Sequence, residues 1–223
     1  PVLIEPLFFK FQPLKNEELA ARVKAVMARA GLQVDRVQQV DASRRSKHSN
    51  AYFTGVGRVK RIVLFDTLLE QMQDDEIVGV LAHEAGPWKL GHIWKRLLLM
   101  ELLSLIACWL AWILLGQGVL PGWFGFGELS FIAQFVLLCF LASLAGFFLT
   151  PLSSGLSRRQ EWQADRFAFD LTGNAQSLSN ALVKLSRENL SNLHPHPRYA
   201  WFYYSHPPVT ARIDRLAEME SSA

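Results

Sequence analysis

Cysteine and charge are both scarce in this sequence. Its 223 residues include two cysteines, Cys108 and Cys139, and 19% of them are charged, whereas about 25% are charged in a typical soluble domain. Neither cysteine has the spacing of sulfur ligands, so both are expected to be small core residues. The formal net charge of +3 is too small to indicate a nucleic-acid-binding protein, and a basic face toward anionic lipid fits it better.

No signal peptide leads the sequence, which starts at Pro1 without a methionine. We therefore interpret the chain as part of a longer protein.

Two long apolar runs occupy the middle of the chain. Residues 97–115 include one charged side chain, Glu101, and residues 129–152 include none. A helix needs about 20 apolar residues to cross the hydrocarbon core of a bilayer, and a soluble helix is rarely apolar on all sides over that length. The sequence therefore predicts a transmembrane hairpin over 97–152, and the alternative is a pair of fully buried soluble helices.

The charges around the hairpin predict its orientation. The connection 116–130 has no Lys or Arg, whereas Lys95 and Arg96 precede the hairpin and Arg158 and Arg159 follow it. The positive-inside rule places both flanks in the cytoplasm. The segments before and after the hairpin can then share a site, and we expect an integral, multi-pass membrane protein with that site on the cytoplasmic side.

The first 75 residues predict a small soluble α+β portion. Residues 16–31 have Asn16 as a helix cap and Gly31 as the stop. Residues 37–41, 50–55 and 61–66 have strand patterns. Asp74 can cap the next helix, which runs through Glu84.

A candidate metal site begins in the segment VLAHEAGPWKLGH, residues 80–92. In zinc proteases the pattern H-E-x-x-H sets two histidines on one helix face, and the glutamate activates the water on the metal. His83 and Glu84 fit this pattern, but position 87 is a proline, which has neither a ligand atom nor a backbone N–H. Pro87 also predicts a helix that is bent or broken near Gly86–Pro87.

The segment RRQEWQADRFAFD, residues 158–170, provides a complement to His83. Glu161 and Asp165 lie one helical turn apart in it. A glutamate ligand on a second helix, with an aspartate that orients a ligand histidine, is typical of a zinc site. The alternative is an acidic surface face, but Ala164 and Phe167 indicate that this helix is largely packed.

These two motifs, together with DASRRSKHSNAYFTG (41–55) and YYSHPPVTARIDRL (203–216), resemble the type I CAAX prenyl proteases. Those are membrane-embedded zinc endopeptidases of the gluzincin clan. The likeness runs from about Pro6 to Leu216 and is to the C-terminal half of family members, which have more transmembrane helices before this region.

The expected fold is α+β with a membrane part. It is mainly helical, with a small strand region near the N-terminus, a gluzincin-like pair of zinc helices and a transmembrane hairpin. We expect an N-terminal part of the metallopeptidase domain over 1–96, the hairpin over 97–152, and a C-terminal part with the third-ligand helix over 153–223.

The resemblance implies a role for each residue that matches a family motif. His83 and Glu161 correspond to the first and third zinc ligands. Glu84 corresponds to the general base, and Asp165 to the residue that orients His83. One zinc ion is the implied cofactor, and weak or absent binding is expected here because the second ligand is replaced by Pro87.

Four further residues resemble groups that handle the substrate. Asn50 and Ala51 resemble an edge strand that pairs with the substrate backbone. His206 and Arg212 resemble the groups that stabilise the oxyanion. The implied partners are a peptide or protein substrate, prenylated at its C-terminus in the family's case, and membrane lipid, whereas no nucleic acid is expected.

The remaining histidines are poor replacements for the missing ligand. His92 lies nine residues after His83, on the opposite side of a straight helix and about 13 Å further along it. His194 and His196 lie in a proline-rich loop, and His48 lies in a polar loop. None of the four is favoured.

Two functions therefore remain open. The first is a zinc-dependent membrane endopeptidase of the CAAX prenyl protease type, in which zinc and Glu84 activate the attacking water. The second is a catalytically inactive membrane pseudoprotease or inactivated variant that acts as a binding protein or scaffold, which Pro87 favours.

Overall fold

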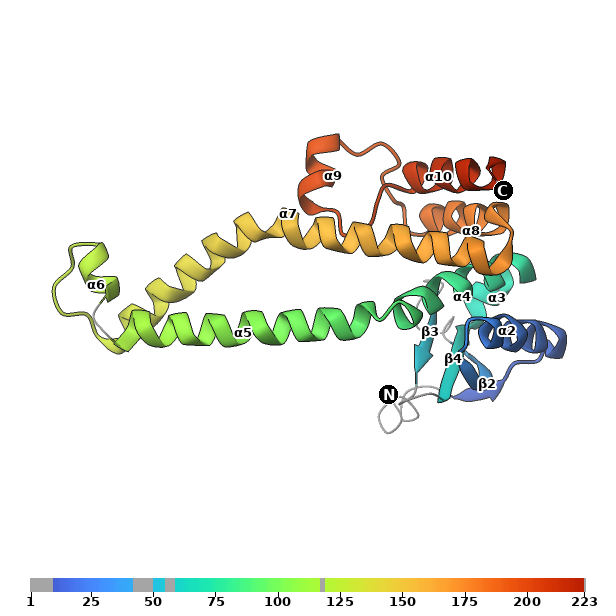
Figure 1. The fold of residues 1–223 in the computed structure, drawn as a ribbon, viewed down its shortest axis with the longest axis horizontal. Helices are drawn as coiled ribbons and strands as arrows, with labels where there is room; N and C mark the ends of the chain where they lie inside the picture. The colour runs from blue at the N-terminus through green and yellow to red at the C-terminus, as the bar shows by residue number, and fades with distance from the viewer. Residues whose placement is uncertain (1–9, 42–49, 55–58, 117–118, 223) are drawn as a thin grey trace.

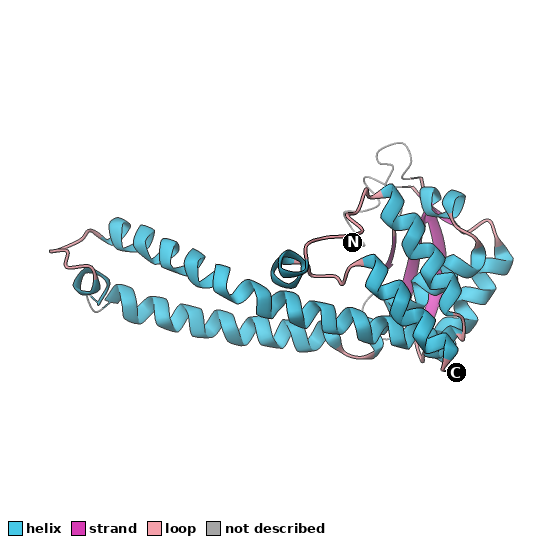
Figure 2. Cartoon of the chain, turned by 90° about the horizontal axis from the view of Figure 1, so that it is seen from above, coloured by secondary structure: helices cyan, strands magenta, loops and turns pink. Residues whose placement is uncertain are grey.

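The computed structural model of the chain describes residues 10–41, 50–54, 59–116 and 119–222. Figure 1 shows a small sheet near the N-terminus, a body of packed helices beside it, and a long helical hairpin that extends from this body. The second view shows the same extended hairpin (Figure 2). The predicted fold class, mainly helical with a small sheet and a membrane part, is confirmed.

The sheet has four strands in the order β1-β2-β4-β3. β1 (Phe11–Pro13) pairs antiparallel with β2 (Gln33–Val40), which pairs parallel with β4 (Val59–Phe65). β3 (Ala51–Thr54) pairs antiparallel with β4 and forms the edge of the sheet. The three predicted strands are confirmed, although β2 begins four residues earlier than expected.

α2 (Glu17–Arg29) begins and ends as predicted. The side chain of Asn16 accepts a hydrogen bond from the backbone N–H of Leu19 at 2.9 Å, and Gly31 adopts a left-handed φ of +72° after the helix. Its buried stripe of Leu19, Val23 and Met27 packs into the main core, against the sheet and α4. The helix is thereby fixed by a cap, a stop and an apolar face.

α3 (Asp66–Gln71) and α4 (Asp74–Lys89) follow the sheet. The N-cap of α4 is Gln73 rather than Asp74, because the side chain of Gln73 and that of Glu76 form a reciprocal capping box. α4 lies between the sheet and α2 on one side and α7 and α8 on the other, so it is buried along most of its length. This central position explains why α4 carries the first site residues.

The helix is not broken at Gly86–Pro87, so that form of the prediction is wrong, whereas a bend there stays a prediction. α4 continues through Pro87 to Lys89, and the chain turns only at Gly91, whose φ is +69°. A proline removes one helical hydrogen bond, here to the carbonyl of His83, and costs about 3 kcal/mol in a helix interior. Ala85 and Gly86 are buried against neighbouring elements, and this packing holds the helix together despite the proline.

α5 (His92–Gly116) and α7 (Phe131–Thr172) form the predicted hairpin, and the short α6 (Val119–Trp123) lies between them. Both long helices are apolar enough to cross a membrane, and the most apolar 18-residue window of each contains no buried residue. They are therefore not the core helices of a soluble protein. The prediction that Cys108 and Cys139 are core residues is wrong, because both are exposed on the apolar surface of the hairpin.

α7 is 42 residues long and carries both a membrane segment and site residues. Its apolar part ends at Leu152, and the helix then continues without interruption past Glu161 and Asp165 to Thr172. Figure 1 shows a bend along α7, and Pro151 within the helix is a common cause of such bends. The second site helix is thus a direct extension of a membrane helix.

Three helices complete the body: α8 (Ala175–Glu188), α9 (Pro197–Tyr203) and α10 (Val209–Ser221). α8 packs on α4 and α10, and α10 also contacts α7. α9 lies against α7, where the rings of Phe202 and Phe147 have centroids 4.9 Å apart. This arrangement brings α10 to the face of α7 that carries Asp165.

Candidate metal centre

His83, Glu161 and Asp165 meet where α4 crosses α7. The Nδ1 of His83 lies 2.8 Å from Oδ1 of Asp165, and its Nε2 lies 3.5 Å from Oε2 of Glu161. His83 and Asp165 are buried, with 8% and 1% of their surfaces exposed. Because a carboxylate only accepts hydrogen bonds, Nδ1 of His83 donates to Asp165, and this fixes the orientation of the ring.

Arg212 reaches the same site from α10. Its Nε donates to Oδ2 of Asp165 at 2.8 Å, and its Nη2 donates to Oδ1 at 2.6 Å. Nη1 lies 3.5 Å from Oε2 of Glu161. Nη2 also approaches Nδ1 of His83 at 3.3 Å, but both nitrogens donate toward Asp165, so this is a contact rather than a hydrogen bond. The guanidinium therefore holds the two carboxylates.

Glu84 and His206 line a cavity of about 140 Å³ together with His83, Glu161 and Arg212. The Nε2 of His206 lies 3.6 Å from Oε1 of Glu161, and 67% of the His206 side chain is exposed. Its Nδ1 is 3.0 Å from Oγ of Ser205. His206 is thus the solvent-facing side chain of the site, whereas Arg212 is buried.

The site shifts the pKa values of its own groups. Burial alone would lower the pKa of His83, but hydrogen bonds with Asp165 and Glu161 outweigh it and raise that pKa to about 9. Burial would raise the pKa values of Glu161 and Asp165, but hydrogen bonds with His83, and with Arg212 for Asp165, lower both. Burial raises the pKa of Glu84. Without a metal, the protonated His83 is the cation that binds the two carboxylates.

The donor set does not fit a zinc site of the usual kind. Such a site needs three protein ligands and an open position for water. His83 and Glu161 supply two, and position 87, one turn after His83, is occupied by a proline within α4. Among the described residues, no group of three or more His, Cys, Asp or Glu side chains could hold a metal ion. Within the described part of the chain, the site is one ligand short.

The histidines outside the His83 cavity, His92, His194 and His196, do not replace the missing ligand. His92 is buried at the start of α5 and lines a different cavity from the one beside His83. His194 and His196 lie before α9, and His194 lines a third cavity. His48 lies outside the described residues.

Asn50 and Ala51 lie at the edge of the sheet, apart from the His83 cavity. The carbonyl of Asn50 accepts a hydrogen bond from the N–H of Phe65 at 3.0 Å, and Ala51 opens β3 opposite Leu64. β3 contacts α4, the helix of His83.

Sequence reasoning missed the close approach of α4 and α7. A Cβ on Gly86 would lie 3.0 Å from Cα and 3.1 Å from Cβ of Ala164, so only a glycine lets the helices come this near. That contact holds His83 within reach of Asp165. The small size of Gly86 and Ala164 was the feature of the sequence that could have indicated this close helix contact.

Helices from both sides of an apolar hairpin thus bring a histidine, three carboxylates and an arginine together beside a small sheet. The model of peptidase family M48 matches residues 13–220, so the chain belongs to that family. A metal, typically zinc, belongs to the family's chemistry.

The chain is similar to proteins named CAAX prenyl protease 1. It is 37% identical to the homologue from Oryza sativa subsp. japonica over 99% of this chain and 52% of the relative, and 37% identical to the Saccharomyces cerevisiae protein over 97% and 51%. The crystal structure of S. mikatae Ste24p superimposes with a TM-score of 0.84 at 36% identity, covering 97% of this chain and 54% of that one. The chain spans about half the length of the relatives it matches.

Proposed function

We propose that this chain binds the C-terminal segments of peptides as a protein of the CAAX prenyl protease type, and that it hydrolyses them at no more than a background rate. The proposal rests on a contrast between the paired side chains around His83 and the proline one turn after it. His83, Asp165, Arg212 and Glu161 form a complete, buried network, yet the residue one turn after His83 is Pro87. The chain therefore keeps the site residues of its family except for one metal ligand, and we expect that loss to abolish hydrolysis.

The network supports a role for each of its members. His83 and Glu161 are the two remaining ligands, and Asp165 holds the ring of His83. Glu84 is the proton acceptor, because its carboxylate lines the cavity and burial brings its pKa nearer to neutrality. Arg212 donates to Asp165 and acts by positioning that carboxylate. His206 is therefore the better candidate for a hydrogen-bond donor beside an oxyanion.

The free edge of β3 is the proposed binding site for a peptide backbone. Residues of an antiparallel strand direct their backbone groups alternately toward and away from the partner strand. Since Asn50 bonds to Phe65, Ala51 directs its N–H and C=O outward, and no strand in the described part of the chain pairs with that edge. An extended peptide can add there as a further strand, beside α4.

The membrane orientation completes the proposal. The hairpin is basic at the end where it joins the body, with Lys95 and Arg96 on one side and Arg158 and Arg159 on the other. The positive-inside rule then places the His83 cavity on the cytoplasmic side. The relatives are about twice as long as this chain. We expect the part of the relatives that this chain does not match to contain further membrane helices.

Binding and turnover can be measured in one sample. A fluorescent peptide that ends in a farnesylated CAAX sequence is added to the detergent-solubilised chain, with anisotropy reporting binding and chromatography reporting cleavage. We expect saturable binding without product. Ala51→Pro, which removes the outward N–H, should weaken binding about two- to tenfold, the worth of one hydrogen bond, whereas Ala51→Ser keeps the N–H and should not. Cleavage above the enzyme-free rate, or binding equal in both variants, would contradict the proposal.

A further inference from the structure

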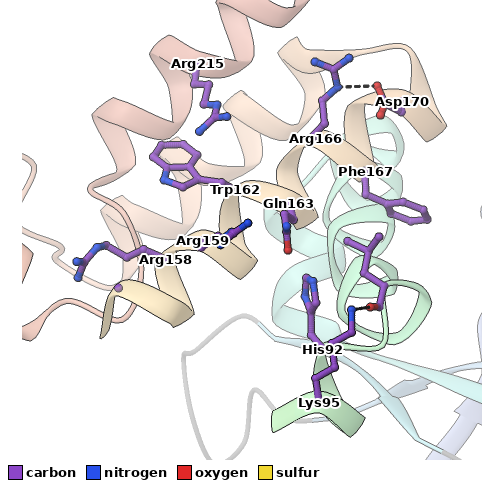
Figure 3. Close-up of a pocket in the computed structure, with 12 residues that line it drawn as sticks. His92, Lys95, Arg158, Arg159, Trp162, Gln163, Arg166, Phe167, Asp170 and Arg215 are labelled. Carbon is purple, nitrogen blue, oxygen red and sulfur yellow. Dashed lines mark hydrogen bonds and ion pairs between the residues drawn. The ribbon is translucent and has the colours of Figure 1, made fainter. Parts of the chain in front are cut away.

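A second cavity lies away from the His83 cavity, at the point where the hairpin joins the body (Figure 3). It has a volume of about 700 Å³ and is formed by the start of α5, residues 155–170 of α7 and one residue of α10. It shares no lining residue with the cavity beside His83. Five cations line it and only one carboxylate does, although the whole chain has a net charge of +3. The cations are Lys95, Arg158, Arg159, Arg166 and Arg215.

Most of this positive charge is not neutralised inside the protein. The carboxylate, Asp170, pairs with Arg166 at 2.9 Å. Arg215 lies over the ring of Trp162, with its Cζ 4.7 Å from the ring centroid. Arg159 makes no hydrogen bond or ion pair that joins it to another described residue. A concave surface with several unneutralised cations attracts and holds anions.

His92 provides an independent sign of a missing partner. It lines the cavity together with Gln163 and is 5% exposed. Its Nδ1 is buried and has no hydrogen-bonding partner within the part of the chain that the structure describes. Buried polar nitrogens are nearly always paired, so an unpaired one at the wall of a cavity indicates a ligand or water on the cavity side.

The cavity lies at the level expected for lipid headgroups. Nη1 of Arg158 donates to the carbonyl of Tyr204 at 2.6 Å and approaches that of Ala200 at 3.3 Å, which ties this wall to α9. α9 exposes Tyr199, Trp201 and Tyr203, and its Phe202 packs on Phe147 within the apolar part of α7. Exposed Trp and Tyr beside a membrane helix are typical of the membrane–water interface.

We propose that this cavity binds a phosphate-type anion, most naturally the headgroup phosphate of an anionic lipid. Arginine forks match phosphate oxygens in geometry and charge, and juxtamembrane cations are attracted to anionic leaflets. Arg159 on α7 and Lys95 on α5 line the cavity from two helices, and Nζ of Lys95, which donates to the carbonyl of Leu90 at 3.1 Å, keeps two further N–H groups for an anion. Nδ1 of His92 is the other unpaired group at the cavity wall. A free phosphate would use the same contacts, so the experiment separates the two sources.

The test uses the full chain in a neutral detergent. Dioctanoyl phosphatidic acid, dioctanoyl phosphatidylcholine and inorganic phosphate are each titrated, and binding is followed by thermophoresis. We expect saturable binding of phosphatidic acid, at least tenfold tighter than phosphatidylcholine, and at least a tenfold loss in Lys95→Gln/Arg159→Gln. Arg36→Gln/Arg187→Gln removes two exposed arginines outside the cavity, so it is the matched control for loss of charge and should bind as the unmodified chain does. Thermal unfolding of each variant shows that it is folded, and Arg159→Lys should retain most of the binding.

The possible results distinguish a lipid headgroup from a free phosphate, and both from failure of the proposal. Phosphatidic acid binding that greatly exceeds phosphate binding supports the lipid headgroup. Equal affinities for both, each lost in the double variant, support a free phosphate in the same cavity. Phosphatidic acid binding that is unchanged in the folded double variant, or no tighter than that of phosphatidylcholine, overturns the proposal.

Discussion

The guanidinium of Arg212 forms two parallel hydrogen bonds with the carboxylate of Asp165, at 2.8 Å from Nε and 2.6 Å from Nη2. Both side chains are more than nine-tenths buried. The pair joins α10 to α7 and sets the carboxylate that orients His83 on α4. One bidentate contact thus fixes three helices around the site.

Arg212→Lys should destabilise the protein by about 3 kcal/mol. A lysine keeps the charge but cannot form the fork, and a buried carboxylate is left with poor pairing. Arg166→Lys changes the same group in the exposed i,i+4 pair with Asp170 and should cost less than about 0.5 kcal/mol. Thermal unfolding in detergent measures both. Similar midpoints for the two variants would show that the Arg212 fork does not hold the site.

Stability of the metal-free protein should fall as the pH rises from 6.5 to 9. The pKa of His83 is raised from 6.5 to about 9, so the folded state favours the protonated ring. Its contribution is complete below pH 6.5 and is lost as the pH passes 9, which amounts to about 2–3 kcal/mol. Urea unfolding of EDTA-treated protein across this range measures it. His83→Gln should flatten the profile, and an equally steep profile in that variant would assign the dependence to other groups.

Gly86→Ala should destabilise the protein although alanine favours helices. The added methyl group would lie 3.0 Å from Cα of Ala164, and overpacking of this kind costs about 1–3 kcal/mol, against about 0.5–1 kcal/mol gained in helix propensity. Gly155→Ala in α7 is the control, because its added Cβ meets only Arg158 at 3.7 Å. That variant should be neutral or slightly stabilising. If both variants behave alike in thermal unfolding, the α4–α7 contact is looser than described.

The chain should require detergent or lipid to stay monodisperse. Exposed apolar residues on α5 and α7 include Leu98, Trp112, Ile132 and Phe148, each at least 66% exposed. Such a surface has no stable state in water. Size-exclusion chromatography with and without detergent checks this expectation. A single monomeric peak in plain buffer would contradict the membrane assignment of the hairpin.

Local patterns made much of the fold predictable. The cap and stop of α2 and the two apolar runs are decided by residues close in sequence, and all four are confirmed. The course of α4 at Pro87 was not predictable, because packing against α7 overrides the local effect of the proline. The unbroken α7 was missed for a similar reason, since the pattern suggested a boundary near 152.

The site was predictable only as a set of residues. His83, Glu161 and Asp165 are recognisable from their motifs, but the commitment of Arg212 to Asp165 depends on how α10 packs. The basic residues Lys95, Arg158 and Arg159 predicted the orientation of the hairpin. That they share one cavity with Arg215 follows only from the three-dimensional arrangement.

We propose that Pro87 alone separates the His83 site from a complete zinc site. The most direct measurement is the zinc content of the purified chain beside Pro87→His and Pro87→Ala, by elemental analysis after dialysis against zinc. Both variants restore the backbone hydrogen bond to the carbonyl of His83, but only histidine restores a ligand. We predict about one zinc per chain in Pro87→His and little in the other two. Stoichiometric zinc in the unmodified chain, or none in a folded Pro87→His, would contradict the account.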